Sequence, residues 1–353
     1  MSEMIEIAVL GHGVVGSGVV ELAQKNRQSI ARKVGGEVQV AKILERRDFS
    51  GLPYASKFTQ NFDEILAEPK IRVVVEVMGG IDPAYDFAAK ALQAGKSVVT
   101  SNKELVAAKG YELLALARKN SVNFLFEASV GGGIPIIRPL HQCLAANEID
   151  EIVGILNGTT NFILTKMIRE GMSFESALKM AQQLGYAEAD PTADVQGHDS
   201  CRKICILASL AFGSHIYPEK VQTRGIVEIT PEDVKYAQSI GRVIKLLGMA
   251  KKTAHGKVEV AVQPAMVSRE SPLAGIEDVF NGILVRGDAT GEVMFYGKGA
   301  GGLPTASAVV GDVIDCLRAQ GTITTLHWGP EQPEKLTAPA GDEKSPGGIL
   351  VWE

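Results

Sequence analysis

Short apolar segments alternate with amphipathic segments along the first third of the chain. A short apolar run bounded by glycine or polar residues predicts a buried strand, and an apolar position at every third or fourth residue predicts a helix. Strands are predicted over residues 5–10, 38–44, 73–77, 97–100 and 123–126. Helices are predicted over 14–28, 62–67, 83–94 and 105–119. This alternation predicts a parallel, doubly wound sheet with right-handed crossovers.

The alternation ends after Gly133. Later strands are predicted over 149–156, 257–266, 282–288 and 291–296, and later helices over 162–170, 174–184, 199–212, 231–247 and 306–317. We therefore expect an α/β protein with an N-terminal doubly wound Rossmann domain over 1–133, to which 303–320 returns. An α+β substrate domain with a mixed sheet is expected over 134–302. Residues 321–353 are rich in proline, glycine and charge, and they predict an irregular tail.

The composition excludes several classes of partner. Of the 353 residues, 45% are hydrophobic and 22% are charged, which is typical of a soluble globular protein, and the net charge is −5. No dense block of lysine and arginine is present, so nucleic acid is a poor candidate partner. The N-terminus lacks the apolar core of a secretory signal, and the apolar runs are too short to span a membrane. The four cysteines show no CxxC spacing and predict thiols in a reducing cytoplasm.

A glycine-rich turn, Gly11-His-Gly13-Val-Val-Gly16, directly follows the first predicted strand and directly precedes the first helix. In this context the spacing is typical of a dinucleotide-binding loop. Gly11 permits the tight turn, Gly13 lets the backbone approach a pyrophosphate, and Gly16 allows close contact between helix and strand. Free N–H groups at the start of the helix, at Val14 and Val15, favour binding of the phosphates. A plain structural turn is the alternative.

The second predicted strand ends in residues that suit either NAD or NADP. Glu45 at this place would accept a hydrogen bond from the ribose 2′-hydroxyl of NAD, whereas Arg46 and Arg47 would pair with the 2′-phosphate of NADP. The two arginines favour NADP, or use of both coenzymes, with Arg46 as the candidate contact. The alternative is that both arginines are solvated surface charges.

Two further motifs follow predicted strands of the first domain. Lys103, in Ser-Asn-Lys-Glu, comes directly after the strand 97–100, at the sheet edge where ligands gather in such folds. Its ammonium is expected near the nicotinamide, unless it is an ordinary surface lysine. Glu127 begins the segment EASVGGGIP, whose glycines can present backbone groups to an ion or a substrate. A hinge between domains is the commoner explanation of such a glycine run.

Four carboxylates lie close together in the segment 185–203, which reads GYAEADPTADVQGHDSCRK. They belong to Glu188, Asp190, Asp194 and Asp199. Asp199 and Lys203 are four residues apart, so on a helix both side chains project from the same face. A carboxylate that orients an ammonium is a common way to hold a lysine that transfers protons. A divalent-metal site built from the carboxylates is the alternative, and the adjacent Arg202 and Lys203 disfavour it.

These motifs occur in an order that resembles the homoserine dehydrogenase family over residues 5–320. They comprise the glycine-rich turn, SNKELVA at 101–107, EASVGGGIPI at 127–136, NGTTNFILTKM at 157–167, the segment 185–203, and GKGAGGLPTASAVVGD at 297–312. The resemblance implies interconversion of L-homoserine and L-aspartate 4-semialdehyde with NAD(P), toward threonine, methionine and isoleucine. It also implies a cytoplasmic homodimer that dimerises through its second domain.

The resemblance implies a role for each matching residue. Lys203 and Lys103 match the acid–base lysine and its partner in the active site, and Asp199 matches a nearby polar residue that orients them. Lys103 and Asp199 are also expected to contact the substrate, and Lys103 the coenzyme. Glu188 matches the carboxylate that binds the substrate's ammonium group. A sodium ion is implied on backbone carbonyls at Glu127, Val130, Gly132 and Ile134, and a cleft for coenzyme and substrate at Gly185 and Gly301.

Two other functions stay open at this point. One is a Rossmann dehydrogenase of another small amino or hydroxy acid, and the other is a dinucleotide sensor without catalysis. A sensor would be expected to lose its proton-transfer groups, yet Lys103 and Lys203 are both present. Many members of the family carry a C-terminal ACT domain, which needs on the order of 70 residues. The polar tail predicts a short, monofunctional form without that domain.

Overall fold

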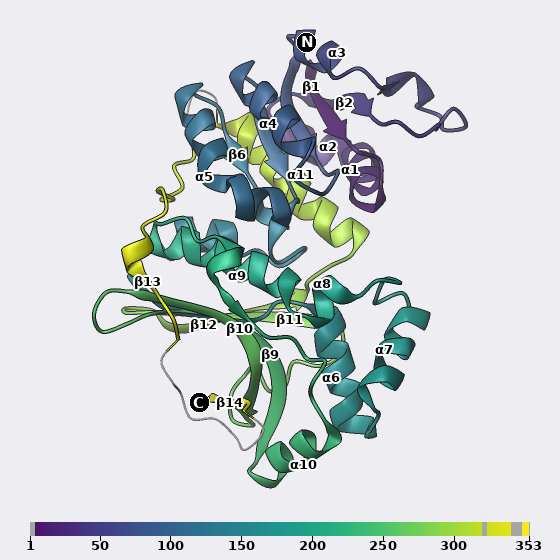
Figure 1. Cartoon of the computed structure of the whole chain (residues 1–353). Helices are drawn as coiled ribbons and strands as arrows, with labels where there is room; N and C mark the ends of the chain where they lie inside the picture. Colours follow the sequence, from purple (N-terminus) through teal and green to yellow (C-terminus); the bar gives the residue numbers. More distant parts are fainter. Residues whose placement is uncertain (1–3, 320–322, 340–347, 353) are drawn as a thin grey trace. The chain divides into compact units, whose positions relative to one another are not determined.

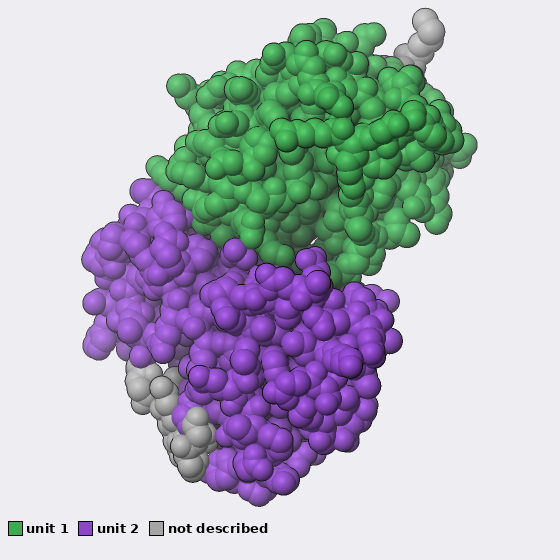
Figure 2. All heavy atoms as spheres, turned by 45° about the vertical axis from the view of Figure 1, so that its right-hand side comes forward, with its two compact units in different colours: residues 1–137, 300–327 green, residues 138–299, 328–353 purple. Residues whose placement is uncertain are grey.

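The computed structural model describes residues 4–319, 323–339 and 348–352. The chain divides into two compact units, which Figure 2 shows in different colours. Unit 1 comprises residues 1–137 and 300–327, and unit 2 comprises 138–299 and 328–353. No helix among the described residues is long and apolar enough to cross a membrane.

Unit 1 is built on a six-stranded sheet in the order β3-β2-β1-β4-β5-β6, and every pair of neighbours is parallel. The strands are β1 (Met4–Leu10), β2 (Glu37–Leu44), β3 (Phe58–Thr59), β4 (Ile71–Glu76), β5 (Ser97–Thr100) and β6 (Phe124–Leu125). The strand order reverses between β1 and β4, which is where ligands bind in doubly wound folds. The sheet confirms the fold class predicted for the first domain.

Amphipathic helices cover this sheet. They are α1 (Val14–Lys25), α2 (Arg27–Val34), α3 (Phe62–Ala67), α4 (Ala84–Gln93), α5 (Lys103–Lys119) and α11 (Gly302–Arg318), with short turns η1 (Ala55–Lys57) and η2 (Glu127–Ser129). Val19 of α1 and Val309 of α11 join the same buried cluster as Val75 and Val99 of the sheet. Helix α11 returns to unit 1 from late in the chain and packs closely on α1, because Gly18 leaves no side chain between them.

Unit 2 contains a mixed sheet of eight strands, as the sequence predicts for the second domain. The path β12-β11-β7-β9-β10 is antiparallel, and β8, β13 and β14 each pair with β10 in parallel. The strands are β7 (Ile149–Ile155), β8 (Gln222–Thr223), β9 (Arg242–Lys252), β10 (Val258–Ser268), β11 (Phe280–Gly287), β12 (Gly291–Lys298), β13 (Leu336–Thr337) and β14 (Leu350–Trp352).

The helices of unit 2 include one that is almost fully buried. They are α6 (Gly158–Glu170), α7 (Phe174–Gln183), α8 (Thr192–Val195), α9 (His198–Phe212) and α10 (Pro231–Ser239), with η3 (Pro139–Cys143), η4 (Pro218–Lys220) and η5 (Pro333–Lys335). Helix α9 lies along the sheet and packs against β7, β9 and β10 (Figure 1). The absence of a side chain at Gly248 of β9 lets Ile204 of α9 approach the strand. This packing fixes the segment that carries Asp199 and Lys203.

The structure corrects two of the predicted helices. The helix predicted over 231–247 ends at Ser239, and Arg242–Lys252 is instead the long strand β9. Gly241 turns the chain with φ +72°, and β9 then pairs with both β7 and β10, which outweighs any helical preference of its sequence. The helix predicted over 14–28 is interrupted at Asn26, and α2 continues to Val34.

The described residues of the tail, 323–339 and 348–352, are more ordered than the sequence predicts. Trp328 is 2% exposed, and its indole N–H donates a hydrogen bond of 2.9 Å to His215. Leu350 of β14 belongs to the buried cluster of the second sheet. The sequence does not reveal these contacts, because each involves a single apolar residue or a strand of only two or three residues within a polar segment. Residues 320–322 and 340–347 lie outside the described part of the chain.

Lys245 is a charged group inside the second core, 2% exposed, on β9. Its ammonium donates hydrogen bonds to the side-chain oxygen of Asn161 at 3.2 Å and to the carbonyl of Ile276. Burial lowers the pKa of Lys245 to about 8, while Glu277 opposes this shift and Arg169 adds to it. Neutral oxygen atoms thus hold an ammonium that is costly to keep charged.

We expect this burial to make stability rise with pH. An unfolded lysine titrates near a pKa of about 10.4, so between about pH 8 and 10.4 the unfolded chain binds more protons than the folded one. Over that window the free energy of unfolding should rise by ~3 kcal/mol relative to the variant Lys245→Met. Urea unfolding of both proteins across the window measures this difference. If the difference in the free energy of unfolding between the two proteins does not change with pH, Lys245 is not a buried ammonium with a lowered pKa.

Candidate active site

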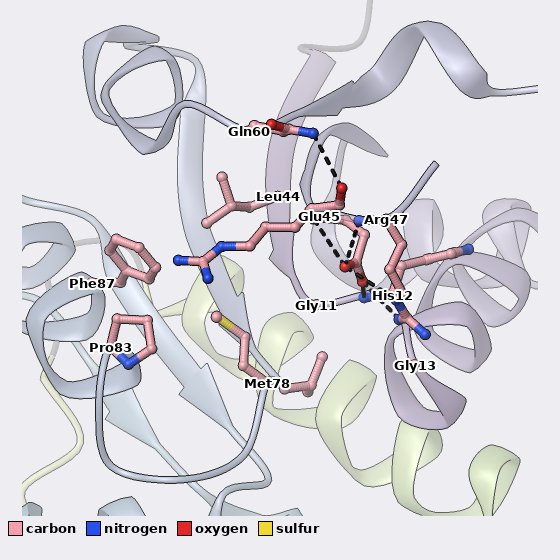
Figure 3. A pocket seen from close by; sticks show the side chains of 12 residues that line it. Gly11, His12, Gly13, Leu44, Glu45, Arg47, Gln60, Met78, Pro83 and Phe87 are labelled. Carbon is pink, nitrogen blue, oxygen red and sulfur yellow. Dashed lines mark hydrogen bonds and ion pairs between the residues drawn. The ribbon is translucent and has the colours of Figure 1, made fainter. Parts of the chain in front are cut away.

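A pocket of about 330 Å³ opens in unit 1 at the carboxyl ends of β1, β2 and β4. It is lined by Gly11, His12, Gly13, Leu44, Glu45, Arg46, Arg47, Gln60, Val77, Met78, Pro83 and Phe87. In Figure 3, Pro83 and Phe87 lie across the pocket from His12 and Arg47. The pocket lies at the predicted dinucleotide-binding turn, and it is lined by both apolar and charged side chains.

The glycines of the turn have different constraints. Gly11 has φ +96°, and a side chain at Gly16 would overlap the carbonyl oxygen of Gly11. A side chain at Gly13 would meet nothing within 4 Å, so the space beside it is open. Helix α1 begins at Val14, and Gly13 at its N-cap makes no side-chain cap. The first N–H groups of α1, at Val14 and Val15, are thus left for a ligand, which fits a phosphate.

The charged residues at the end of β2 have unequal surroundings. Glu45 accepts hydrogen bonds from the backbone N–H groups of His12 and Arg46, at 3.0 and 2.9 Å, and from the guanidinium of Arg47 at 2.8 Å. The hydrogen bond from Arg47 is the largest cause that lowers the pKa of Glu45 to about 2. Arg46 is exposed. Among the described residues its guanidinium has neither a hydrogen bond nor an ion pair.

His12, which the sequence analysis did not single out, supports this turn. Its ring is 6% exposed and packs edge-on against Phe49 at 4.8 Å and Phe58 at 5.1 Å between centroids. Tyr54 lies 3.3 Å from its Nε2 atom. Burial lowers the pKa of His12, which disfavours the charged imidazolium, although the nearby Glu45 carboxylate opposes this shift. The aromatic residues at 49, 54 and 58 surround it only in the fold, so spacing alone does not reveal the cluster.

A chain of buried hydrogen bonds positions Lys103 at the start of α5. Glu76, at the end of β4, accepts a hydrogen bond of 2.6 Å from the hydroxyl of Thr100, at the end of β5. Burial raises the pKa of Glu76. Asn102 caps α5 by accepting the N–H of Leu105 at 3.1 Å, and its amide donates to the carbonyl of Gly80 at 2.6 Å. Lys103 follows directly as the first residue of the helix, half-buried at this edge of the sheet.

The segment after β6 folds around the carboxylate of Glu127. Glu127 is 3% exposed and accepts the N–H groups of Ile136 at 2.6 Å and Ile137 at 2.9 Å. Gly132 has φ +57°, and a side chain at Gly131 would overlap the carbonyl of Ile134. Val130 and Ile134 are also buried. The glycine run is therefore a compact loop in unit 1. Gly301, the N-cap of α11, lies in the same unit with φ +129°.

Asp199 and Lys203 form a buried ion pair in unit 2, as their spacing predicts. The Lys203 Nζ atom donates to Asp199 Oδ2 at 2.8 Å and to the carbonyl of Leu156 at 2.8 Å. The side chain of Lys203 is only 10% exposed and that of Asp199 only 5%. A buried pair of this kind is stable only when its remaining polar atoms are also hydrogen-bonded.

Asn157 supplies a further hydrogen bond to this pair, and the sequence analysis missed it. The amide of Asn157 donates to Asp199 at 2.9 Å and to Asp194 at 2.7 Å. The side-chain oxygen of Asn157 accepts the N–H of Thr160 at 2.8 Å and so caps α6. The cap signal in NGTTN could have indicated the start of the helix, but not the contact with Asp199. Asn157 thus links the start of α6 to α8 and to the first turn of α9.

We expect Asn157→Ala to destabilise the protein by ~1–3 kcal/mol, because it removes a donor from the buried carboxylate of Asp199 and also removes a helix cap. The variant should also turn over more slowly, since Asp199 loses one of the groups that orient it. Thermal unfolding and steady-state kinetics measure the two effects. Asn120→Ala, which removes a hydrogen bond to Leu116 at the end of α5, serves as the control. Equal kinetics in the two variants would contradict the assigned role.

The other acids of the segment 185–203 have separate surroundings. Asp190 accepts the N–H of Thr192 at 3.1 Å, which starts α8, and this contact with Thr192 lowers the pKa of Asp190. Glu188 and Gly185 are exposed. Within residues 4–319, 323–339 and 348–352, no group of three histidines, cysteines or acids is placed to hold a metal. Asp190 binds the backbone at the start of α8, and Asp194 binds the amide of Asn157.

The sequence matches two family models over most of its length. The model described as homoserine dehydrogenase matches residues 135–314, and the one described as the NAD-binding domain of homoserine dehydrogenase matches residues 11–127. A homoserine dehydrogenase of Bacillus subtilis is 42% identical over 342 residues, which cover 95% of this chain and 78% of that protein.

Solved structures agree with these matches. The crystal structure of a homoserine dehydrogenase from Thiobacillus denitrificans has a TM-score of 0.88 at 40% identity, covering 95% of this chain and 78% of that one. A hyperthermophilic archaeal homoserine dehydrogenase in complex with NADPH has a TM-score of 0.75 at 31% identity, covering 89% of this chain and 98% of that one. Both likenesses extend over the two units.

Proposed function

Because this chain belongs to the homoserine dehydrogenase family of NAD(P)-dependent oxidoreductases that act on a CH–OH group, we propose a role for each unit and for its site residues. Unit 1 binds the coenzyme, and unit 2 binds L-homoserine, carries the acid–base lysine and dimerises. The reaction interconverts L-homoserine and L-aspartate 4-semialdehyde on the route to threonine, methionine and isoleucine. The observation that carries this proposal is the buried pair of Lys203 and Asp199.

Lys203 is the group that moves the proton. The nicotinamide, when bound, supplies the hydride chemistry. In the oxidising direction the amine of Lys203 accepts the hydroxyl proton of homoserine, and in the reducing direction its ammonium returns a proton to the aldehyde oxygen. Asp199 and the carbonyl of Leu156, each 2.8 Å from Nζ, fix the direction in which the lysine points. Lys103, which follows the helix cap at Asn102 in unit 1, is proposed as a second catalytic lysine, whose ammonium polarises an oxygen of the substrate.

The pocket of unit 1 is the coenzyme site, and we propose that it prefers NADP. The open space at Gly13 and the uncapped start of α1 fit a pyrophosphate. The exposed guanidinium of Arg46 lines the pocket and is available to a 2′-phosphate. Gly301 of unit 1 and Gly185 of unit 2 are proposed to contribute to ligand binding, each within its own unit.

An absorbance assay at about 340 nm, where reduced nicotinamide absorbs, tests the activity with homoserine and each coenzyme. We expect homoserine-dependent reduction of the coenzyme, faster at low concentrations of NADP than of NAD. No turnover with either coenzyme would refute the proposed reaction. Equal affinity for NADP before and after Arg46→Ala would refute the role of Arg46 alone.

Glu188 is proposed to bind the ammonium group of homoserine. We expect Glu188→Ala to raise the KM for homoserine by about 10-fold to 100-fold, the value of a charge-assisted hydrogen bond, with little change in coenzyme affinity. Initial-rate kinetics at varied homoserine measure this. Glu175→Ala, which removes an exposed carboxylate at the start of α7, is the control. A loss confined to kcat would assign Glu188 to the chemical step instead.

We also propose a sodium ion on backbone carbonyls of the loop that contains Glu127, Val130, Gly132 and Ile134. The loop is compact and buried, and its glycines turn several backbone groups toward one another. Thermal unfolding in sodium chloride and in equimolar choline chloride tests this, because an ion that binds the folded state raises Tm. Identical Tm values would refute the site.

A homodimer formed through unit 2 is proposed as the assembly, in the reducing cytoplasm, where the four free thiols persist. The edge strand β12 leaves Met294 39% exposed and Tyr296 54% exposed, which is unfavourable for a monomer. Light scattering on the purified protein gives the mass. The mass of a single chain at micromolar concentration would refute the dimer.

A further inference from the structure

Glu45 occupies the position at which a Rossmann fold distinguishes NAD from NADP, yet its carboxylate is saturated by the protein itself. Its Oε2 atom accepts from the His12 N–H at 3.0 Å and from a terminal guanidinium nitrogen of Arg47 at 2.8 Å. Its Oε1 atom accepts from the N–H groups of Arg46 and Arg47 at 2.9 and 3.2 Å, and from Arg47 Nε at 3.2 Å. A carboxylate has about four acceptor positions, so few are left for a ligand.

The contact with Arg47 also changes the charge that a coenzyme would meet. A free carboxylate here accepts a hydrogen bond from a ribose 2′-hydroxyl and repels a 2′-phosphate. With the guanidinium of Arg47 bound in a fork to both oxygens, that negative charge is compensated and its acceptors are occupied. The site then offers few hydrogen-bond acceptors to the ribose 2′-hydroxyl of NAD, and it does not repel the 2′-phosphate of NADP.

The two adjacent arginines are not equivalent. Arg47 is turned toward Glu45, and its guanidinium also lies 5.3 Å from the centre of the Phe49 ring. Figure 3 shows Arg47 and Glu45 together beside the turn at His12. Arg46 lines the pocket, and among the described residues its guanidinium has no hydrogen-bond or ion-pair partner. One arginine is therefore available to a ligand, and the other is committed to the carboxylate.

We propose that Arg47 sets the coenzyme preference indirectly, as a positioning residue that blocks Glu45 and so prevents it from selecting NAD. The proposal rests on the pocket of unit 1 being the coenzyme site. It adds a physical reason for the proposed preference for NADP over NAD. Arg47 is 63% exposed in its side chain, whereas Glu45 is 11% exposed. The carboxylate is fixed by three backbone N–H groups, so it stays in place when the guanidinium is removed.

The test measures the Kd of NADH and of NADPH by fluorescence titration in Arg47→Met. We expect NADH to bind about 10-fold to 100-fold more tightly, the value of a hydrogen bond from ribose to a charged acceptor. The double variant Glu45→Gln/Arg47→Met should lose this gain, because the charged acceptor is gone. Arg32→Met, which removes an exposed arginine from α2, is the control for loss of a surface cation.

Two results separate this proposal from its alternatives. If Arg47 contacts the 2′-phosphate itself, Arg47→Met weakens the binding of NADPH and leaves the Kd of NADH unchanged. The double variant Glu45→Gln/Arg47→Met then behaves in the same way, and the blocking role is refuted. The blocking role is also refuted if the double variant still binds NADH more tightly than the unchanged protein does. A separate measurement tests the proposed contact between Arg46 and the coenzyme. An unchanged Kd for NADPH in Arg46→Ala would refute that contact without bearing on Arg47.

Discussion

Lys203→Met is expected to lower kcat by ~10²–10⁴-fold, the usual contribution of a positioned acid–base group, while the Kd of the coenzyme changes little. The substitution keeps an unbranched side chain of nearly the same length and removes the Nζ atom that we propose to carry the proton. Lys203 donates to Asp199 and to the carbonyl of Leu156 in a site that is almost closed to water. No bulk water can therefore take over the transfer efficiently.

The same change leaves Asp199 as a buried charge without its cation, which typically costs ~3–5 kcal/mol. Thermal unfolding must therefore accompany the kinetics. The double variant Lys203→Met/Asp199→Asn removes the unpaired charge and should recover stability without recovering turnover. Lys235→Met, at an exposed position on α10, controls for the loss of a lysine. Recovery of activity in the double variant would mean that the lysine is structural.

The second large effect is expected at the glycine-rich turn, where two alanine substitutions should have opposite consequences. A methyl group at Gly16 overlaps the carbonyl of Gly11, and neither atom can move without breaking the turn between β1 and α1. Gly16→Ala should destabilise unit 1 by roughly 1–3 kcal/mol or more. A methyl group at Gly13 enters open space, so Gly13→Ala should fold normally.

Coenzyme binding gives the other half of this prediction. The space beside Gly13 is where a pyrophosphate would approach the backbone, so Gly13→Ala should weaken coenzyme binding by about 10-fold to 100-fold, from lost hydrogen bonds to a charged group. Differential scanning calorimetry without ligand and isothermal titration with NADPH separate the two effects. A normal Kd in Gly13→Ala would remove the turn from the proposed coenzyme site.

Much of unit 1 could be predicted because its signals are local. The strand at Ser97–Thr100 and the helix at Phe62–Ala67 have the predicted bounds, since apolar runs and polar boundaries coincide there. The spacing of Asp199 and Lys203 likewise predicts a contact that one helical turn is enough to form. These features depend on neighbours in the chain, and neighbours are visible in the sequence.

Unit 2 was harder to predict because its signals depend on distant partners. The run at 242–252 suits a helix or a strand, and only pairing with β7 and β10 decides between them. Lys245 is polar in the sequence but buried in the structure, because Asn161 and Ile276 provide acceptors at that point. Trp328 and Leu350 become anchors of the tail for the same reason.

The sequence by itself determined the class of fold, the glycine-rich turn and the set of charged side chains available for chemistry. The spacing also predicted the pair of Asp199 and Lys203, but only the tertiary structure decided which distant groups bind the carboxylates. Glu45 is bound by Arg47 and by the N–H of His12, which is 33 residues away, and Asp199 is bound by Asn157, which is 42 residues away. Hydrogen bonds of this kind form where strand ends and loops meet in space, and no periodicity along the chain encodes them.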